Sequence, residues 1–187
     1  MRLFVALEIP AAVRENIAAL NRELRPLAPQ LKWARTESLH LTLKFIGEGP
    51  PAKADAIRAA LAEVRGEGAF ELRFCGLGFF PNEKRPRVFW AGMETDGRLA
   101  RLAAEIETKL ERLGIPREDR AFIPHLTLAR FTDQRVPDNF LAAVREQHAR
   151  DFGTLLAAEF FLIESHLKSS GAEYTSLASF PLASTEA

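Results

Sequence analysis

Apolar residues recur along the chain with two different periods. Residues 2–9 (RLFVALEI) form a short apolar run that Pro10 ends, which predicts a strand. HLTLKFIG at 40–47 predicts a second strand, closed by its glycine. Between these runs the apolar positions fall at helical spacing, at Val13, Ile17, Leu20, Leu24 and Leu27. The chain therefore begins with a strand, a helix and a strand.

A helix and a strand complete the first half. Residues 52–65 are rich in alanine and carry Ile57, Leu61 and Val64 at the spacing of one helix face. Residues 70–80 (FELRFCGLGFF) begin with alternation of apolar and polar side chains, which predicts a strand.

The second half follows the same order. RVFWAGM at 87–93 predicts a strand, and Thr95 or Asp96 can cap the next helix. The apolar positions of that helix are Leu99, Leu102, Ile106, Leu110 and Leu113. HLTLARF predicts another strand, and Asp138 can cap a helix through Phe140, Leu141 and Val144. Residues 153–164 and 172–182 are expected to be strands.

The order strand, helix, HxT strand, helix, strand thus occurs twice, at an offset near 85 residues. Phe4 corresponds to Phe89, and His40 corresponds to His125. Internal similarity of this kind indicates repeated structural units. We expect one bilobal domain over residues 1–187, with approximate halves 1–85 and 86–187 related by a two-fold axis. That axis would bring the two histidines to one central cleft.

Each HLTL segment predicts a polar face and an apolar face. Side chains alternate across a strand, so His40 and Thr42 share one face, while Leu41, Leu43 and Phe45 share the other. His125 and Thr127 have the same relation in the second copy. Strict alternation also places Lys44 on the histidine face and Arg130 on the leucine face.

Two imidazoles with two hydroxyls suit acid–base chemistry on a phosphodiester. The unperturbed pKa of histidine is near 6.5, so one ring can accept a proton while the other donates one. Hydroxyls beside them can hold the non-bridging oxygens of a tetrahedral anion. One such motif alone is more often an ordinary wet strand surface, but packing does not require histidine and threonine to recur together. No HxH or HExxH occurs, so no metal site is expected.

Composition and charge restrict the class of protein, its contact with nucleic acid and its compartment. The chain is 47% hydrophobic and 27% charged, as in ordinary globular proteins. With 25 basic and 25 acidic residues the formal charge is zero, so contact with nucleic acid should be limited to an end or a few nucleotides. No apolar run approaches the ~20 residues of a membrane span, and no signal peptide is recognised. Cys75 is the single cysteine, so no internal disulfide can form and we expect a cytoplasmic protein. We also expect a monomer with no membrane partner.

Several motifs together resemble a known family. HLTLKF and PHLTLAR, with FVALEIP, GLGFFP, RVFWAG and ESHLKSSGAEY, are similar to the 2H phosphoesterase superfamily. More narrowly, they resemble its bacterial and archaeal RNA 2′,3′-cyclic phosphodiesterases, also called 2′–5′ RNA ligases. The match runs through nearly the whole chain in order.

The resemblance implies an α+β fold with antiparallel-rich sheets lining a central cleft and helices outside. It implies hydrolysis of 2′,3′-cyclic phosphate at RNA ends to a 2′-phosphate, without metal or cofactor. By the motif match, His40 and His125 are catalytic, and Thr42 and Thr127 bind phosphate. Arg130 occupies the arginine position of the family's HxTLxR pattern and is assigned to phosphate binding.

Alternatives remain open at this point. The substrate could instead be a small cyclic nucleotide phosphate or a 2′–5′ oligonucleotide, or the chain could bind RNA ends without turnover. Reversal of the reaction would ligate RNA ends through a 2′–5′ bond. We assign His125 as base and His40 as acid, with almost equal support for the reverse. His148 and His166 are expected at the surface or rim, and Trp33 and Phe45 in the core.

Overall fold

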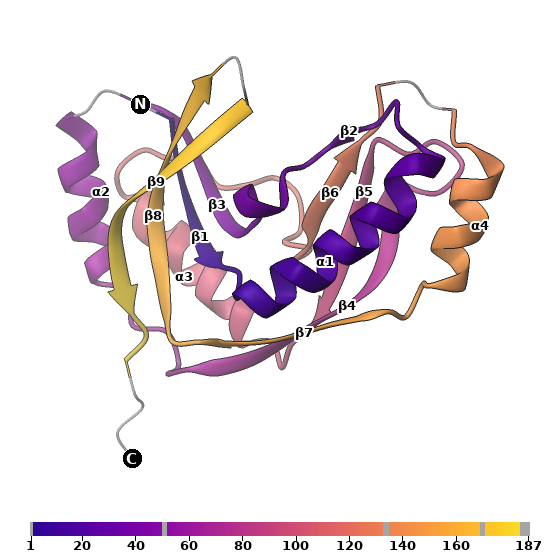
Figure 1. Ribbon diagram of the computed structural model, residues 1–187. Coiled ribbons are helices and arrows are strands. Elements are labelled where there is room, and N and C mark those ends of the chain that lie inside the picture. Colours follow the sequence, from indigo (N-terminus) through magenta and orange to yellow (C-terminus); the bar gives the residue numbers. More distant parts are fainter. Residues whose placement is uncertain (1, 50–51, 133–134, 169–170, 184–187) are drawn as a thin grey trace.

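Two antiparallel sheets form the framework of the protein, seen in a computed structural model that describes residues 2–49, 52–132, 135–168 and 171–183 (Figure 1). The strands are β1 (Arg2–Glu8), β2 (Lys32–Trp33), β3 (His40–Glu48), β4 (Phe70–Phe80), β5 (Val88–Glu94), β6 (Leu126–Arg130), β7 (Asp151–Ala157), β8 (Glu159–Lys168) and β9 (Gly171–Pro181). The α-helices are α1 (Ala11–Leu24), α2 (Ala52–Ala62), α3 (Arg98–Glu111) and α4 (Asp138–Glu146), and short 3-10 helices span Arg25–Leu27 and Thr36–Ser38.

The strand order shows that the two halves of the sequence interlock. One sheet has the order β3-β1-β8-β9 and the other β2-β6-β5-β4-β7. The last strand of the first half, β4, therefore lies in the sheet of β5 and β6. In return β8 lies beside β1. Each sheet contains two strands from the other half, β8 and β9 in the first sheet and β2 and β4 in the second, so neither sheet is built from one half of the sequence alone.

Helices cover the outside of each sheet. α2 and α3 pack together over the first sheet, and α1 and α4 lie over the second (Figure 1). Their predicted apolar faces are buried, with Ile17 and Leu20 of α1 and Ile106 and Leu110 of α3 fully inaccessible. The α+β fold with antiparallel sheets, inferred from the resemblance, is confirmed. None of the helices in the described part of the chain is long and apolar enough to cross a bilayer.

Three local predictions were wrong or incomplete. Pro137, and not Asp138, stands at the N-cap of α4. Gly97, with φ of 91°, stands at the N-cap of α3, while the Asp96 carboxylate accepts a hydrogen bond from the Arg98 amide at 3.1 Å. Residues 153–164 are not one strand, because the chain leaves the second sheet after β7 and enters the first at β8. Only β8 has a counterpart in the first half, so the repeat could not reveal β7.

Candidate active site

A β-bulge interrupts each HLTL strand at the same place. In the pairing of β1 with β3, Ala6 is opposite Thr42 and Val5 is opposite Lys44, which leaves Leu43 as an extra residue. In the pairing of β5 with β6, Leu128 is the extra residue, between Thr127 and Ala129. A bulge sets two residues of one strand against one of its partner and reverses the alternation beyond it.

The first bulge overturns the expected positions of Lys44 and Phe45. Lys44 turns into the interior, where it is 3% exposed, and its Nζ donates to Glu107 Oε1 at 2.8 Å and to the Pro116 carbonyl at 2.7 Å. Phe45 instead stands on the face of Thr42 and is 61% exposed. Strict alternation had predicted the reverse for both residues.

The second bulge brings Arg130 to the face of Thr127. Ala129 is buried opposite Trp33, and Arg130 is exposed opposite Val88. The alternation expected for Arg130 was therefore wrong. Its guanidinium lies on the same side of the sheet as the threonine.

Both motif histidines have the same hydrogen-bond arrangement. Nδ1 of His40 is 2.9 Å from the Ser38 carbonyl oxygen, and Nδ1 of His125 is 2.8 Å from that of Ile123. A carbonyl can only accept, so each Nδ1 carries the proton and each neutral ring has Nε2 as its free acceptor. Both rings are thus held in the tautomer that can exchange a proton through Nε2.

Aromatic rings support both histidines. The ring of His40 makes edge contacts with Phe4 and Tyr174, at centroid distances of 5.9 and 5.0 Å. His125 makes an edge contact with Phe80 at 5.0 Å, and Phe80 lies 5.2 Å from Trp90. Neither Phe4 nor Tyr174 was assigned to the site from the sequence, because contacts between separate strands leave no local signal.

The indole ring of Trp90 lies against the backbone of the second sheet at Gly78. A Cβ atom added to Gly78, its cross-strand partner, would come within 2.2 Å of the indole ring. Trp90 is also opposite Thr127 on the other neighbouring strand. Within the described part of the chain, its indole N–H is buried with no hydrogen-bond partner. Glycine at position 78 is therefore required for the tryptophan to reach this position.

Electrostatics distinguish His40. Burial lowers the pKa of its imidazole below the ordinary value, and the charge of Arg14 adds to this lowering, while the Ser38 hydrogen bond and Glu8 oppose it. Arg14 is fixed by donating to the carbonyls of Ile9, at 3.0 Å, and of Thr36 and Glu37, both at 2.8 Å. The sequence offered no signal for this arginine.

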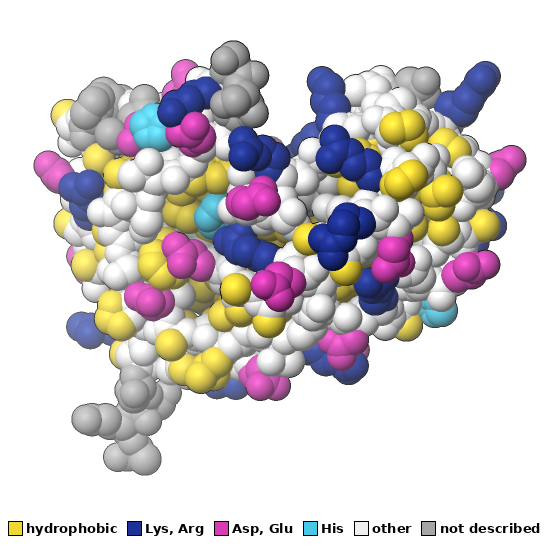
Figure 2. All heavy atoms as spheres, in the orientation of Figure 1, with side chains coloured by type: hydrophobic (Ala, Val, Ile, Leu, Met, Phe, Trp, Pro, Cys, Tyr) yellow, Lys and Arg dark blue, Asp and Glu magenta, His cyan; other side chains and the backbone are white. Residues whose placement is uncertain are grey.

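The two threonines and Arg130 present unused donors. Over residues 2–49, 52–132, 135–168 and 171–183, the hydroxyls of Thr42 and Thr127 form no hydrogen bond, and Arg130 forms no ion pair. β3 and β6, which carry the two motifs, lie on opposite sides of the space between the sheets in Figure 1, and Figure 2 shows the surface hollowed between the two lobes. No hydrogen bond or ring contact joins His40 to His125 within the same described residues.

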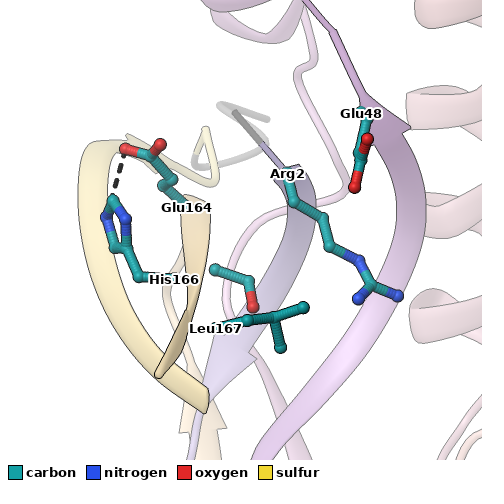
Figure 3. Close-up of a pocket in the computed structure, with 6 residues that line it drawn as sticks. Arg2, Glu48, Glu164, His166 and Leu167 are labelled. Atoms are coloured by element: carbon teal, nitrogen blue, oxygen red, sulfur yellow. Dashed lines mark ion pairs between the residues drawn. The ribbon is translucent and has the colours of Figure 1, made fainter. Parts of the chain in front are cut away.

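The other predicted aromatic and histidine positions lie elsewhere. Trp33 is part of the core, as predicted, with its Nε1 donating to the Ala28 carbonyl at 2.9 Å. His148 is exposed and bonded to the Arg145 carbonyl. His166 is exposed in a shallow pocket of about 300 Å³, where it faces Glu164 at 3.3 Å (Figure 3).

Among the described residues, no group of three His, Cys, Asp or Glu side chains is placed to hold a metal ion.

The chain is similar to known phosphoesterases over most of its length. The family model described as LigT like Phosphoesterase matches residues 7–90 and 93–174. An RNA 2′,3′-cyclic phosphodiesterase of Archaeoglobus fulgidus is 36% identical over 96% of this chain and 99% of its own. One of Thermus thermophilus is 38% identical over 97% of this chain and 90% of its own.

Solved structures show the same relationship. The crystal structure of the Thermus thermophilus protein TT0787 has a TM-score of 0.80 and 36% identity, with both chains covered completely. Escherichia coli LigT in complex with 3′-AMP has a TM-score of 0.77 and 28% identity over 97% of each chain. The resemblance found in the sequence is confirmed, and the chain belongs to the LigT-like phosphoesterase family.

Proposed function

We propose that the protein is a metal-independent RNA 2′,3′-cyclic phosphodiesterase that leaves a 2′-phosphate. The matched hydrogen bonds of His40 and His125 carry this proposal, because they prepare two imidazoles to exchange protons through Nε2. The names of the relatives in Archaeoglobus and Thermus supply the substrate class.

The proposed reaction is an in-line displacement at phosphorus. One histidine removes a proton from water, whose oxygen bonds to phosphorus as the bond from phosphorus to the 3′-oxygen breaks. The other histidine gives its proton to that departing oxygen. Thr42 and Thr127 donate to non-bridging oxygens, and Arg130 offsets the negative charge. With a 5′-hydroxyl as the incoming group on phosphorus, and the same bond broken, the site would join two RNA ends through a 2′–5′ bond.

The lowered pKa of His40 bears on which histidine is the base. A lowered pKa favours the neutral ring in the free protein, and a base must be neutral. We therefore favour His40 as base and His125 as acid, the reverse of the assignment made from sequence. A cyclic phosphodiester with a better leaving group separates the two roles. It should restore turnover to the alanine variant of the acid but not to that of the base.

Both motif copies lie in one chain, so we propose that a monomer is sufficient for activity. We also propose that it acts in the cytoplasm, where the thiol of Cys75 would remain reduced.

The direct test uses a 2′,3′-cyclic mononucleotide and a short RNA with a cyclic end, both in EDTA. We expect turnover of at least the RNA, with a 2′-phosphate product identified by chromatography against authentic 2′- and 3′-phosphates. Binding without turnover would contradict the enzymatic proposal. A 3′-phosphate product would retain the two-histidine chemistry but contradict the proposed bond cleavage.

A further inference from the structure

Lys32 lies beside Arg130 on the face that carries the site. In the second sheet Lys32 is opposite Arg130, and Arg130 is opposite Val88. Directly opposed residues of antiparallel strands project to the same side. The next residue, Trp33, projects to the other side and packs in the core with Phe89. Lys32 therefore shares the face of Arg130 and Thr127.

Within the described ranges, Lys32 and Arg130 are two like charges set directly opposite each other without a counter-charge. Like charges directly opposite in a sheet are destabilising. Over the part of the chain that the structure describes, neither Lys32 nor Arg130 forms an ion pair or a side-chain hydrogen bond, and both are exposed. On the same sheet, by contrast, Arg73 is paired with Asp151 at 2.7 Å. The chain has no net charge, so the unpaired cations are not part of a uniformly basic surface.

The distance between the row that contains Lys32 and the row that contains Thr127 suits two neighbouring phosphates of an RNA chain. The row of Val88, Arg130 and Lys32 lies two residues along β5 from the row of Trp90 and Thr127. That step is about 7 Å along the strand, and neighbouring strands are about 4.8 Å apart. A phosphate at Lys32 would thus lie about one nucleotide from a phosphate held at Thr127. Figure 2 shows further Lys and Arg side chains bordering the hollow between the lobes.

We propose that Lys32, together with Arg130, binds the phosphate on the 5′ side of the terminal nucleotide. The inference rests on the proposed function and narrows its substrate to an RNA end with at least one internucleotide linkage. A cyclic mononucleotide lacks this phosphate and uses the reaction site alone. Lys32 therefore distinguishes an oligonucleotide from a small cyclic nucleotide.

The test compares three substrates in wild type and Lys32→Ala. They are a cyclic mononucleotide, a short RNA with a cyclic end, and the same RNA with a neutral methylphosphonate at its last linkage. Loss of one exposed ion pair should lower kcat/KM for the RNA about fivefold. The effect on the mononucleotide and on the methylphosphonate RNA should stay below about twofold, because neither offers the anionic partner. Lys53→Ala, an exposed lysine on α2, is the matched control.

Equilibrium binding of the same RNA by fluorescence anisotropy makes the test independent of turnover. The slope of log affinity against log salt should fall by about 0.7 in Lys32→Ala for a single-stranded ligand. An equal loss on mononucleotide and RNA, an unchanged salt slope, or the same loss in Lys53→Ala would overturn the subsite. If the wild type binds the RNA with this lysine dependence but does not turn over any substrate, the proposed function fails and the subsite stands.

Discussion

The two copies of HLTL are alike up to the bulge and differ after it. Leu43 and Leu128 are the extra residues, and each reverses the direction of the side chains that follow. In the first copy the reversal buries Lys44 and exposes Phe45; in the second it buries Ala129 and exposes Arg130. The same kind of β-bulge thus exposes a phenylalanine, Phe45, in the first motif and an arginine, Arg130, in the second.

Under the proposed function, this difference would let a site with two matched histidines bind an asymmetric substrate in one orientation. The tautomers of both histidines are fixed alike, so the proton-transfer groups match. Beside them, Phe45 offers an apolar ring on the first sheet, while Arg130 and Lys32 offer positive charge on the second. A nucleotide also has an apolar part, its base, and an anionic part, its phosphates. In the proposed reaction, Phe45, Arg130 and Lys32 would therefore orient the nucleotide on which the two histidines act.

Lys44 also links the two copies. It lies on the strand of His40, yet it bonds to Glu107 and to the Pro116 carbonyl, and Pro116 lies in the segment between α3 and β6 that leads to His125. Glu107 in turn accepts from the Glu118 amide at 2.8 Å. Lys44 is buried and Glu107 is partly buried, so forming this ion pair costs desolvation free energy. The pair therefore contributes by fixing the position of the segment before His125 relative to β3, and not through stability alone.

The largest effect should come from the histidines. His40→Ala and His125→Ala should each reduce kcat by about 10²–10⁴, the usual scale for a lost general acid or base. The double variant should lose much less than the product of the two, because groups that act as a unit are not additive. Steady-state turnover checks this, with His148→Ala as the control. Near-normal turnover of either single variant would refute the shared site.

The next largest effect should come from the ion pair between buried Lys44 and partly buried Glu107. Lys44→Met leaves Glu107 without its cation and should destabilise the fold by about 3 kcal/mol, the lower end of the range for a broken buried pair because Glu107 is partly exposed, measured by urea unfolding. The double variant Lys44→Met/Glu107→Leu should recover most of this loss, because no buried charge is left unpaired. If the single variant is as stable as the wild type, the pair does not hold the two copies together.

The hydroxyls should matter less than the imidazoles. Thr42→Ala and Thr127→Ala each remove a hydrogen bond to a charged oxygen, worth about 1.5–3 kcal/mol. Turnover should fall by roughly 10- to 150-fold, and serine should largely restore it. Serine variants as slow as the alanine variants would show that the threonine methyl packs the strand and that the hydroxyl has no phosphate role.

The local pattern of apolar residues predicted most helices and strands correctly, but it did not predict how the strands pair. The apolar periodicity located the four α-helices, and the repeat identified the two HLTL strands. Neither bulge was predicted, because a bulge depends on the partner strand and the sequence of β3 or β6 alone reads as simple alternation. Lys44, Phe45 and Arg130 were therefore placed on the wrong faces. The sequence also did not predict that β4 joins the sheet of β5 and that β8 joins the sheet of β1. The repeat gives the order of elements in each half, but that order is the same whichever sheet the last strand joins.

The smallest predicted effect can identify the role of His40. Arg14 lowers the pKa of this histidine, so Arg14→Gln should raise it and shift one limb of the bell-shaped profile of kcat/KM toward higher pH. We expect a shift below about one unit, because the charge of Arg14 is not the largest cause of the lowering. If His40 is the base, activity appears as pH rises through its pKa, and the acid limb moves. If His40 is the acid, activity is lost as pH rises through that pKa, and the alkaline limb moves instead.

The control is Arg14→Lys, which keeps the positive charge and should leave both limbs in place. A pH profile that is unchanged in Arg14→Gln would contradict the influence of Arg14 on His40.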